Sequence, residues 1–304
     1  MKNIVIAGSI NMDIVVQLDK YPQKGETVIG KKLSFIPGGK GANQARAISR
    51  LGGKVRLISK VGQDQFGEAL LESLNKEGIS TKSIKLSPRK TSGVALIEVD
   101  KQAENKIIII PGSNYDFSSK DLTQIVLKDN EIAVSQFEIP KEMVKEFFSK
   151  AKKSGSITVL NPSPVSQIPH DLFQLVDYLI INEHEFAYLS KTKQPQIHSE
   201  ALTEDTNKIA GKNQVIIITF GSKGSVAVKG QKIIKTPGFK VKAADTTGAG
   251  DAFLGAFSQA LAEQKGLDDA LIFANATAAL KITKLGASSM PYRKEVEKFM
   301  EKLK

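Results

Sequence analysis

The chain has 304 residues, of which 41% are hydrophobic and 25% charged, a composition typical of one large α/β domain or two smaller ones. It contains no Cys, which excludes disulfides, thiolate metal sites and Cys nucleophiles, and with only His170, His184 and His198 we expect no His-based metal cluster. The 43 basic and 32 acidic residues give a net charge of +11. The basic residues are dispersed and no Trp is present, so an anionic small molecule is the expected partner rather than a nucleic acid.

The amino-terminal stretch MKNIVIAGSINMD has an apolar run too short for the core of a signal peptide. No run approaches the roughly 18 apolar residues that a membrane span needs. We therefore expect a cytoplasmic protein with no membrane partner.

Short β-branched runs alternate with helical patterns along the chain. The runs that predict strands occupy 3–8, 55–62, 132–138, 157–162, 177–182 and 214–221. These runs are continuously apolar, which indicates strands buried on both faces. With helices between them they predict a doubly wound, mostly parallel α/β sheet flanked by helices. In such a sheet, functional residues lie at the carboxyl ends of the strands.

Two segments, 12–36 and 91–110, break this rhythm. Both show period-2 alternation with polar turns, and neither leaves room for a helix. We expect them to form a small second sheet inserted into a single domain that spans 1–304.

Polar residues follow the predicted strands where the strands end. They include Asn11, Asp13, Glu138, Asn161 and Asn182. Such residues either cap the following helices or converge on one site, and no single one of them decides between the two interpretations.

Residues 38–46, GGKGANQAR, lie between the first alternating segment and a predicted helix. Glycines let a ligand approach the backbone, and Lys40 and Asn43 supply donors beside them, although a plain tight turn is the alternative. The chain has no Walker A motif and no G-x-G-x-x-G after its first strand, so those two nucleotide-binding folds are not supported.

Residues 245–251, DTTGAGD, precede an apolar helix that we expect to begin near Gly250 or Asp251. The amides of Ala249, Gly250 and Asp251 would then be unpaired at a helix N-terminus, which favours an anion. A carboxylate at this place is suited to accept a proton from a hydroxyl that attacks a phosphoryl group. The alternative is an Asp that only caps the helix.

The stretches GGKGANQA at 38–45 and DTTGAGDAF at 245–253 resemble the two signatures of the ribokinase, or PfkB, family of sugar kinases, in the family's order and spacing. The stretches GSINMD, QFE, LNPSP, NEHE and ITFGSKG fit the family too, so the resemblance covers essentially the whole chain. It implies a ribokinase-like fold whose small sheet is a lid over the sugar and pairs between subunits of a homodimer. It also implies ATP-dependent phosphorylation of D-ribose at O5, with Mg²⁺ and a monovalent cation, usually K⁺.

The resemblance assigns roles to individual residues. Asp251 would be the general base on the attacking hydroxyl. The anion hole would be formed by the backbone amides of 248–251, which belong to Gly248, Ala249, Gly250 and Asp251. The sugar hydroxyls would be bound by Asn11, Asp13, Gly39, Lys40, Asn43 and Glu138. ATP would be bound by Asn182, Thr219, Gly221, Ser222, Gly224, Gly250 and Asn275. Glu185 would help to place Mg²⁺ through water, and the monovalent-cation site would involve Asp245, Thr247, Lys281, Lys284, Gly286 and Ser289.

The stretch KLGASSMPYR is one residue shorter than the pattern common in the family. The motifs do not separate ribose from 2-deoxyribose, another sugar or a nucleoside. A sugar-binding regulator without turnover is the alternative outside the enzyme class, and the intact Asp251 with its flanking glycines argues against it.

Overall fold

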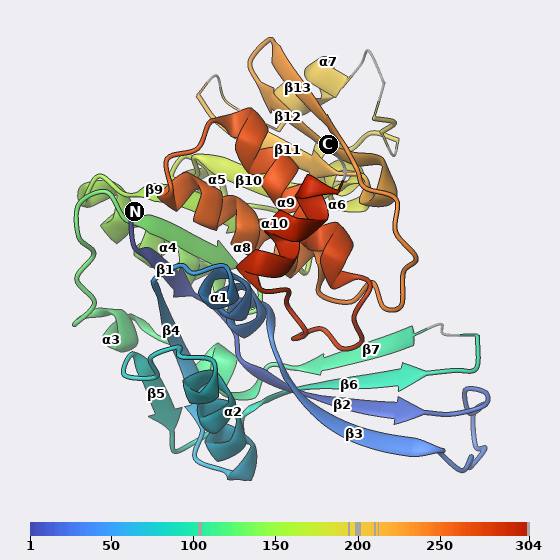
Figure 1. Cartoon of the computed structure of the whole chain (residues 1–304). Coiled ribbons are helices and arrows are strands. Elements are labelled where there is room, and N and C mark those ends of the chain that lie inside the picture. Colours follow the sequence, from blue (N-terminus) through green and yellow to red (C-terminus); the bar gives the residue numbers. More distant parts are fainter. Residues whose placement is uncertain (103–104, 194, 198–201, 210, 212, 303–304) are drawn as a thin grey trace.

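The computed structural model describes residues 1–302 except 103–104, 194, 198–201, 210 and 212 (Figure 1). His198 and two residues of the segment 91–110 therefore lie outside the described residues. Within the described part of the chain, nine strands form the main sheet, in the order β13-β12-β11-β10-β9-β8-β1-β4-β5. Their bounds are β1 Ile4–Ala7, β4 Val55–Gly62, β5 Ile84–Ser87, β8 Ile132–Gln136, β9 Ile157–Asn161, β10 Tyr178–Asn182, β11 Val215–Thr219, β12 Gly224–Lys229 and β13 Lys232–Pro237.

In this order across the sheet, the neighbouring strands β11, β10, β9, β8, β1, β4 and β5 pair in parallel. The strands β12 and β13 add an antiparallel edge. The six predicted strands are present as β1, β4, β8, β9, β10 and β11, with ends shifted by two residues at most. The sequence did not predict β5, β12 or β13. Both β5 and β13 are outermost strands with several exposed residues, so they lack the continuous apolar run that marks the central strands.

Helices cover both faces of the main sheet (Figure 1). Ile4 and Ile6 of β1 pack in one apolar cluster with α1, α8 and α9, whereas Val5 and Ala7 pack in a second cluster with α4 and α6. This two-sided burial is the reason for the apolar runs. The helices are α1 Lys40–Arg50, α2 Gln65–Lys76, α3 Ser119–Leu122, α4 Lys141–Lys153, α5 His170–Phe173, α6 Glu183–Ser190, α7 Leu202–Asn207, α8 Ala249–Ala262, α9 Leu267–Lys281 and α10 Arg293–Glu301, with 3₁₀ turns η1 Gly112–Asp116 and η2 Gly221–Lys223. In the described ranges, no helix has the length and apolar character that crossing a bilayer requires.

A second sheet, here called the small sheet, projects from the main body (Figure 1). It consists of β3 Lys32–Gly38, β2 Asn11–Gln17, β6 Gly93–Val99 and β7 Asn105–Ile110, in that order across the sheet. The chain enters β2 three residues after β1 and returns from β3 directly into α1, so the GGKGANQ stretch lies where the small sheet joins the main body. That this sheet acts as a lid stays a prediction at this point.

The helices α1 and α8, which carry the two signature stretches, pack closely against each other. A Cβ added to Gly255 of α8 would lie 2.6 Å from Cβ of Ala47 and 3.1 Å from the carbonyl oxygen of Gln44, both on α1. Only glycine permits this approach, which brings the start of α1 within side-chain reach of the start of α8.

Candidate functional site

Residues from several strand ends line one cavity at the carboxyl edge of the main sheet. Its volume is about 200 Å³. The residues around it include Lys40, Asn182, Glu185, Thr219, Gly250 and Asp251. These positions come from the ends of β10 and β11 and the starts of α1, α6 and α8, as expected for a doubly wound sheet.

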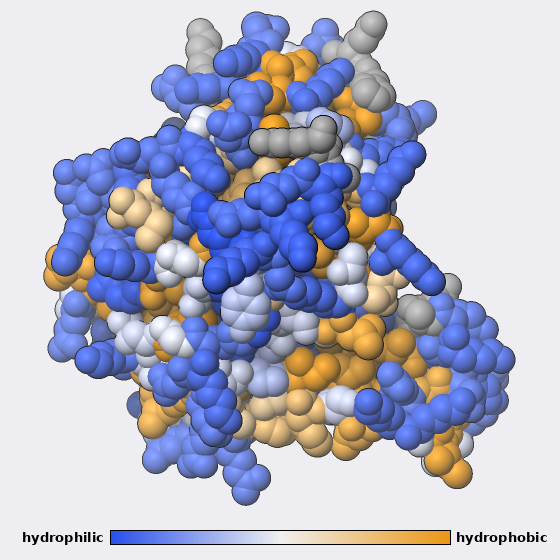
Figure 2. Space-filling model, in the orientation of Figure 1, coloured by the Kyte–Doolittle hydropathy of each residue, from blue (hydrophilic) through white to orange (hydrophobic). Residues whose placement is uncertain are grey.

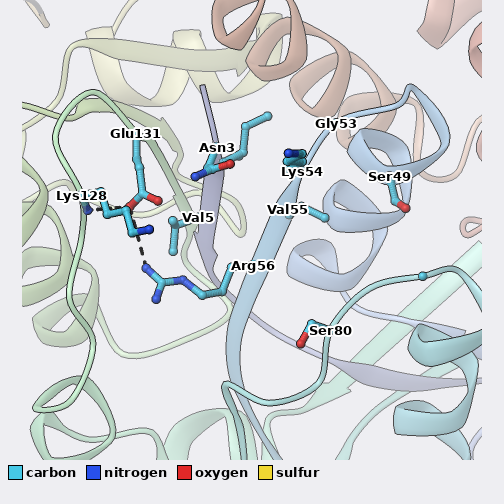
Figure 3. Close-up of a pocket in the computed structure, with 12 residues that line it drawn as sticks. Asn3, Val5, Ser49, Gly53, Lys54, Val55, Arg56, Ser80, Lys128 and Glu131 are labelled. Atoms are coloured by element: carbon cyan, nitrogen blue, oxygen red, sulfur yellow. Dashed lines mark hydrogen bonds and ion pairs between the residues drawn. The ribbon is translucent and has the colours of Figure 1, made fainter. Parts of the chain in front are cut away.

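A larger hollow of about 450 Å³ lies at the opposite, amino-terminal edge of the sheet (Figure 3). Asn3, Lys54 and Glu131, each directly before a strand of the main sheet, line it. The Arg56–Glu131 ion pair there, 3.8 Å long, is a structural contact between β4 and the start of β8. We therefore place the candidate site at the smaller cavity, where the polar strand ends converge.

Asp251 lies in the first turn of α8 with 7% of its surface exposed. The Gln44 Nε2 donates to its Oδ1 at 2.9 Å, and the Asn43 Nδ2 donates to its Oδ2 at 3.3 Å. Burial raises the pKa of Asp251, while the charge of Lys40 and the hydrogen bond from Gln44 oppose that rise. Two amides from α1 therefore hold this carboxylate.

Further hydrogen bonds fix the orientation of those two amides. Gln136, the last residue of β8, donates through Nε2 to the Oε1 of Gln44. Arg46 donates from Nη1 to the Oδ1 of Asn43 at 3.4 Å. Each amide thus has its oxygen engaged and its nitrogen directed at Asp251.

Glu138 is the centre of the expected sugar-binding group. Its Oε2 accepts hydrogen bonds from the Ser9 hydroxyl at 2.5 Å, from Asn11 Nδ2 at 3.3 Å and from the Lys40 amide at 3.2 Å. Asn114 in turn donates to the Oδ1 of Asn11 at 2.7 Å and so orients that amide. The structure brings these residues together from β2, α1, η1 and the end of β8.

Asp13 extends this group from the small sheet. Burial raises the pKa of Asp13 to about 7, with Glu138 and Asp251 adding to the rise and Arg46 opposing it. Gly39, the N-cap of α1, has φ of 89° and lies so close to β2 that an added Cβ would come within 2.6 Å of the Asn11 amide nitrogen.

Lys40 places a positive charge among these acids. Burial alone would lower its pKa, but Asp251, Glu138 and Glu185 together raise the pKa above its ordinary value. The cavity therefore combines several carboxylates with one ammonium group.

The expected nucleotide-binding residues form two neighbouring groups. Asn182 caps α6. The Asn182 Oδ1 accepts hydrogen bonds from the backbone amides of His184 and Glu185, at 2.9 and 2.8 Å, and the Glu185 Oε2 accepts one from the backbone amide of Asn182. Asn275 of α9 donates to the Ser225 hydroxyl at 3.1 Å, which sets it beside the start of β12. The remaining residues of the second group follow β11 in and after η2 and are Gly221, Ser222 and Gly224.

The expected monovalent-cation group lies between the loop before α8 and the segment after α9. The Asp245 carboxylate accepts from the amides of Thr247 at 2.9 Å and Gly286 at 2.8 Å. Burial opposes its ionisation, but these hydrogen bonds and the Lys281 charge hold the pKa of Asp245 below its ordinary value. The Lys281 Nζ donates to the carbonyl oxygens of Asp245 and Lys284, each at 3.4 Å.

Ser289 completes this group, and its polar atoms bond within the segment after α9. Its amide donates to the Gly286 carbonyl at 3.1 Å, and its hydroxyl donates to the Leu285 carbonyl at 2.5 Å.

The start of α8 differs by one or two residues from its expected position. The helix begins at Ala249, with Gly248 as N-cap, rather than near Gly250 or Asp251. The amide of Ala249 donates to the Thr246 carbonyl at 3.2 Å, so the expectation that it is unpaired was wrong. The first helical hydrogen bond runs from Ala252 to Gly248, which leaves the amides of Gly250 and Asp251 ahead of the helical ladder.

Sequence reasoning missed five residues that contact this site: Ser9, Gln44, Arg46, Asn114 and Gln136. Gln44 and Gln136 are fully buried. The available signal was a polar residue at a position that helix or strand periodicity makes apolar, because a buried amide needs partners.

Comparison with known proteins agrees with this geometry. Residues 1–294 match the profile of the pfkB family carbohydrate kinases. The chain belongs to this family. The ribokinase of Bacillus subtilis (strain 168) is 39% identical to it over 306 residues, which cover 99% of this chain and 100% of that protein. The deoxyribokinase of Salmonella typhi is 32% identical over 306 residues, which cover 99% and 98% of the two chains.

The fold of this pfkB-family chain is also that of a solved relative. The Arabidopsis thaliana ribokinase, solved with ribose and ATP, superposes with a TM-score of 0.88 at 30% identity, covering 99% of each chain. The predicted ribokinase-like fold class is therefore confirmed.

The raised pKa of Asp13 makes stability depend on pH. The carboxyl ionises in the unfolded state near its ordinary pKa of 3.8 but in the folded state only near pH 7, so the folded state loses stability as pH rises from about 4 to about 7. We expect Asp13→Asn to increase the free energy of unfolding by about 2 kcal/mol at about pH 8, and much less at about pH 4. Urea unfolding at the two pH values measures this.

Asp19→Asn is the control for this prediction. The Asp19 side chain is 62% exposed and pairs with Lys31, so its removal should change stability little at either pH. A loss of stability in Asp13→Asn at about pH 8 would contradict the expected cost of the buried charge.

Proposed function

We propose that the chain phosphorylates D-ribose at O5 with ATP, giving D-ribose 5-phosphate and ADP. The observation that carries this proposal is the buried Asp251 at the N-terminus of α8, hydrogen-bonded to α1 and close to the Glu138 group. The similarity to ribokinases over the whole chain supports the choice of sugar. ATP as the donor is the reason to propose a cytoplasmic site of action.

In the proposed reaction, Asp251 accepts the proton of the O5 hydroxyl while that oxygen attacks the γ-phosphorus. The bond from phosphorus to the bridging oxygen breaks, and its electrons leave with ADP. The amides of Gly250 and Asp251, ahead of the α8 ladder, would stabilise the charge on the transferred group. Gly248 and Ala249 shape this turn, although the Ala249 amide already has a protein partner.

The sugar is proposed to bind through Asn11, Asp13, Gly39, Lys40, Asn43 and Glu138. Carboxylates and amides in fixed directions suit vicinal hydroxyls, which need both acceptors and donors. The hydrogen bonds around Glu138 and Asn11 hold these groups in place before a ligand arrives. ATP is proposed to bind along Asn182, Thr219, Gly221, Ser222, Gly224 and Asn275, which follow the ends of β10 and β11 or neighbour them.

Mg²⁺ is proposed near Glu185. This carboxylate lines the same cavity as Asp251, and its Oε2 is held by the Asn182 amide. Mg²⁺ commonly keeps several waters, so one nearby carboxylate suits it, and bound with ATP it would neutralise phosphate charge. The resemblance also implies a monovalent cation near Asp245, and K⁺ at that position stays a prediction from the resemblance.

The small sheet is proposed to act as a lid inserted into the single domain 1–304. Asp13 on β2 contributes to the sugar group, so closure of this sheet would exclude water that otherwise accepts the phosphoryl group. We also propose that it is the contact of a homodimer. Figure 2 shows apolar residues gathered over this sheet, and Leu33, Phe35 and 107–110 are exposed.

A substrate panel tests the proposed function. ADP release is measured with ribose, 2-deoxyribose, fructose, adenosine and pseudouridine, each with and without K⁺. We expect ribose to be the best substrate, and a higher kcat/KM for another acceptor would contradict the choice of sugar. 2-Deoxyribose is the second candidate because the deoxyribokinase similarity covers nearly the whole chain.

Asp251→Asn tests the general base. We expect turnover to fall by about a hundredfold to ten-thousandfold while ribose binding is retained, because the amide cannot accept the proton. Stopped-time assays give kcat, and calorimetry gives ribose affinity.

Asp268→Asn is the matched control, since Asp268 is an exposed carboxylate in the first turn of α9. If Asp251 only stabilised the first turn of its helix, both variants would lose up to about 1 kcal/mol of stability and keep their activity. Substantial turnover in Asp251→Asn would remove it from the base role.

The homodimer is tested on each face of the small sheet. Leu96 pairs with Ile108, and Ile97 pairs with Ile107 on the other face. We expect the wild type to sediment as a dimer and one of the double variants, Leu96→Lys/Ile108→Lys or Ile97→Lys/Ile107→Lys, to sediment as a monomer, because Lys opposes burial of the apolar contact. A monomeric wild type, or dimers in both variants, would exclude this interface.

A further inference from the structure

Lys281, the last residue of α9, is a buried ammonium bound by backbone carbonyl groups. Its relative exposure is 0%. Its Nζ lies 3.4 Å from the carbonyl oxygen of Asp245 and 3.4 Å from that of Lys284. Burying a charge is costly unless polar partners surround it, and the two carbonyl oxygens offset part of that cost for the Lys281 ammonium.

These contacts tie together two segments that support the start of α8. The amides of Ala244 and Asp245 donate to the Ile282 carbonyl at 2.7 and 3.0 Å. The Asp245 carboxylate bonds the amides of Thr247 and Gly286. The Lys281 ammonium adds a positive charge to the same junction. Ala244, the first residue of this junction, lies four residues before Gly248, the N-cap of α8.

Several of the oxygens expected to hold K⁺ already have protein partners. The carbonyls of Asp245 and Lys284 accept from Lys281. The Gly286 carbonyl accepts from the Ser289 amide, and the Ser289 hydroxyl donates to a neighbouring carbonyl. An ammonium and K⁺ carry the same charge and use the same carbonyl ligands, so both would compete for one place. The residues present therefore do not fit an additional monovalent cation.

We propose that the ammonium of Lys281 is a built-in cation that takes the place of K⁺ in this protein. It holds the loop 244–248 against the segment 281–286 and thereby fixes the turn that carries Gly250 and Asp251. This inference rests on the proposed kinase function for its activity readout. A protein of this kind needs no added monovalent cation.

The test compares the wild type with Lys281→Ala and Lys281→Met in buffer whose only monovalent cation is choline. We expect the wild-type kcat to be unchanged within error when K⁺ or NH₄⁺ is added. Lys281→Ala should lose at least about tenfold in kcat without K⁺, and K⁺ or NH₄⁺ should restore it, because the shorter side chain leaves room for an ion. Lys281→Met keeps most of the side-chain length without the charge, and it should lose activity without being restored.

Thermal unfolding supplies a readout that does not depend on activity. An ion that binds only the folded state raises the unfolding temperature, so K⁺ should stabilise Lys281→Ala but leave the wild type unchanged. Lys265→Met is the control, because the Lys265 ammonium pairs with Glu263 at 3.4 Å and takes no part in this junction. It should behave as the wild type does.

Two results would overturn the built-in cation. One is strong activation and stabilisation of the wild type by K⁺. The other is full K⁺-free activity and unchanged unfolding in Lys281→Ala. If the wild type phosphorylates none of the sugars with or without K⁺, the proposed function fails, while the response of unfolding to K⁺ still decides the role of Lys281.

Discussion

The site depends on the close contact between α1 and α8. Gly255 lets the two helices approach until Gln44 can donate to the buried carboxylate of Asp251. The charge of that carboxylate is then met by two oriented amides and by Lys40, all from one helix start. Without this contact Asp251 would be an unpaired buried charge, which a folded protein rarely tolerates.

The acids of the site are held in an arrangement that costs stability. Burial raises the pKa of Asp13 and of Asp251, and the neighbouring Glu138 carboxylate adds to the rise at both. Their positions follow from different elements, the small sheet, the end of β8 and the start of α8. A site that must bind hydroxyls and accept a proton benefits from this concentration of acceptors, and the hydrophobic core on both faces of the sheet compensates for it.

Much of the fold was predictable because the central strands are buried on both faces and therefore continuously apolar. Strands at the sheet edge, such as β5 and β13, lack that pattern, since part of each faces water. In the site, the glycine-flanked Asp251 and the polar strand ends were visible in the sequence. The hydrogen bonds of Gln44 and Gln136 were not, because their partners are about 90 to 200 residues away along the chain and only packing brings them together.

The sequence by itself determined the family, the alternation of strands and helices, and the residue types that carry the chemistry, because these are encoded in local periodicity and short motifs. The tertiary structure decided which side chains share a hydrogen bond. It turned Gln44 toward Asp251, set the Asp13 carboxyl beside two others, and directed the Lys281 ammonium at the carbonyls of Asp245 and Lys284. Such contacts depend on distances between elements remote in the chain, and only the packed fold sets those distances.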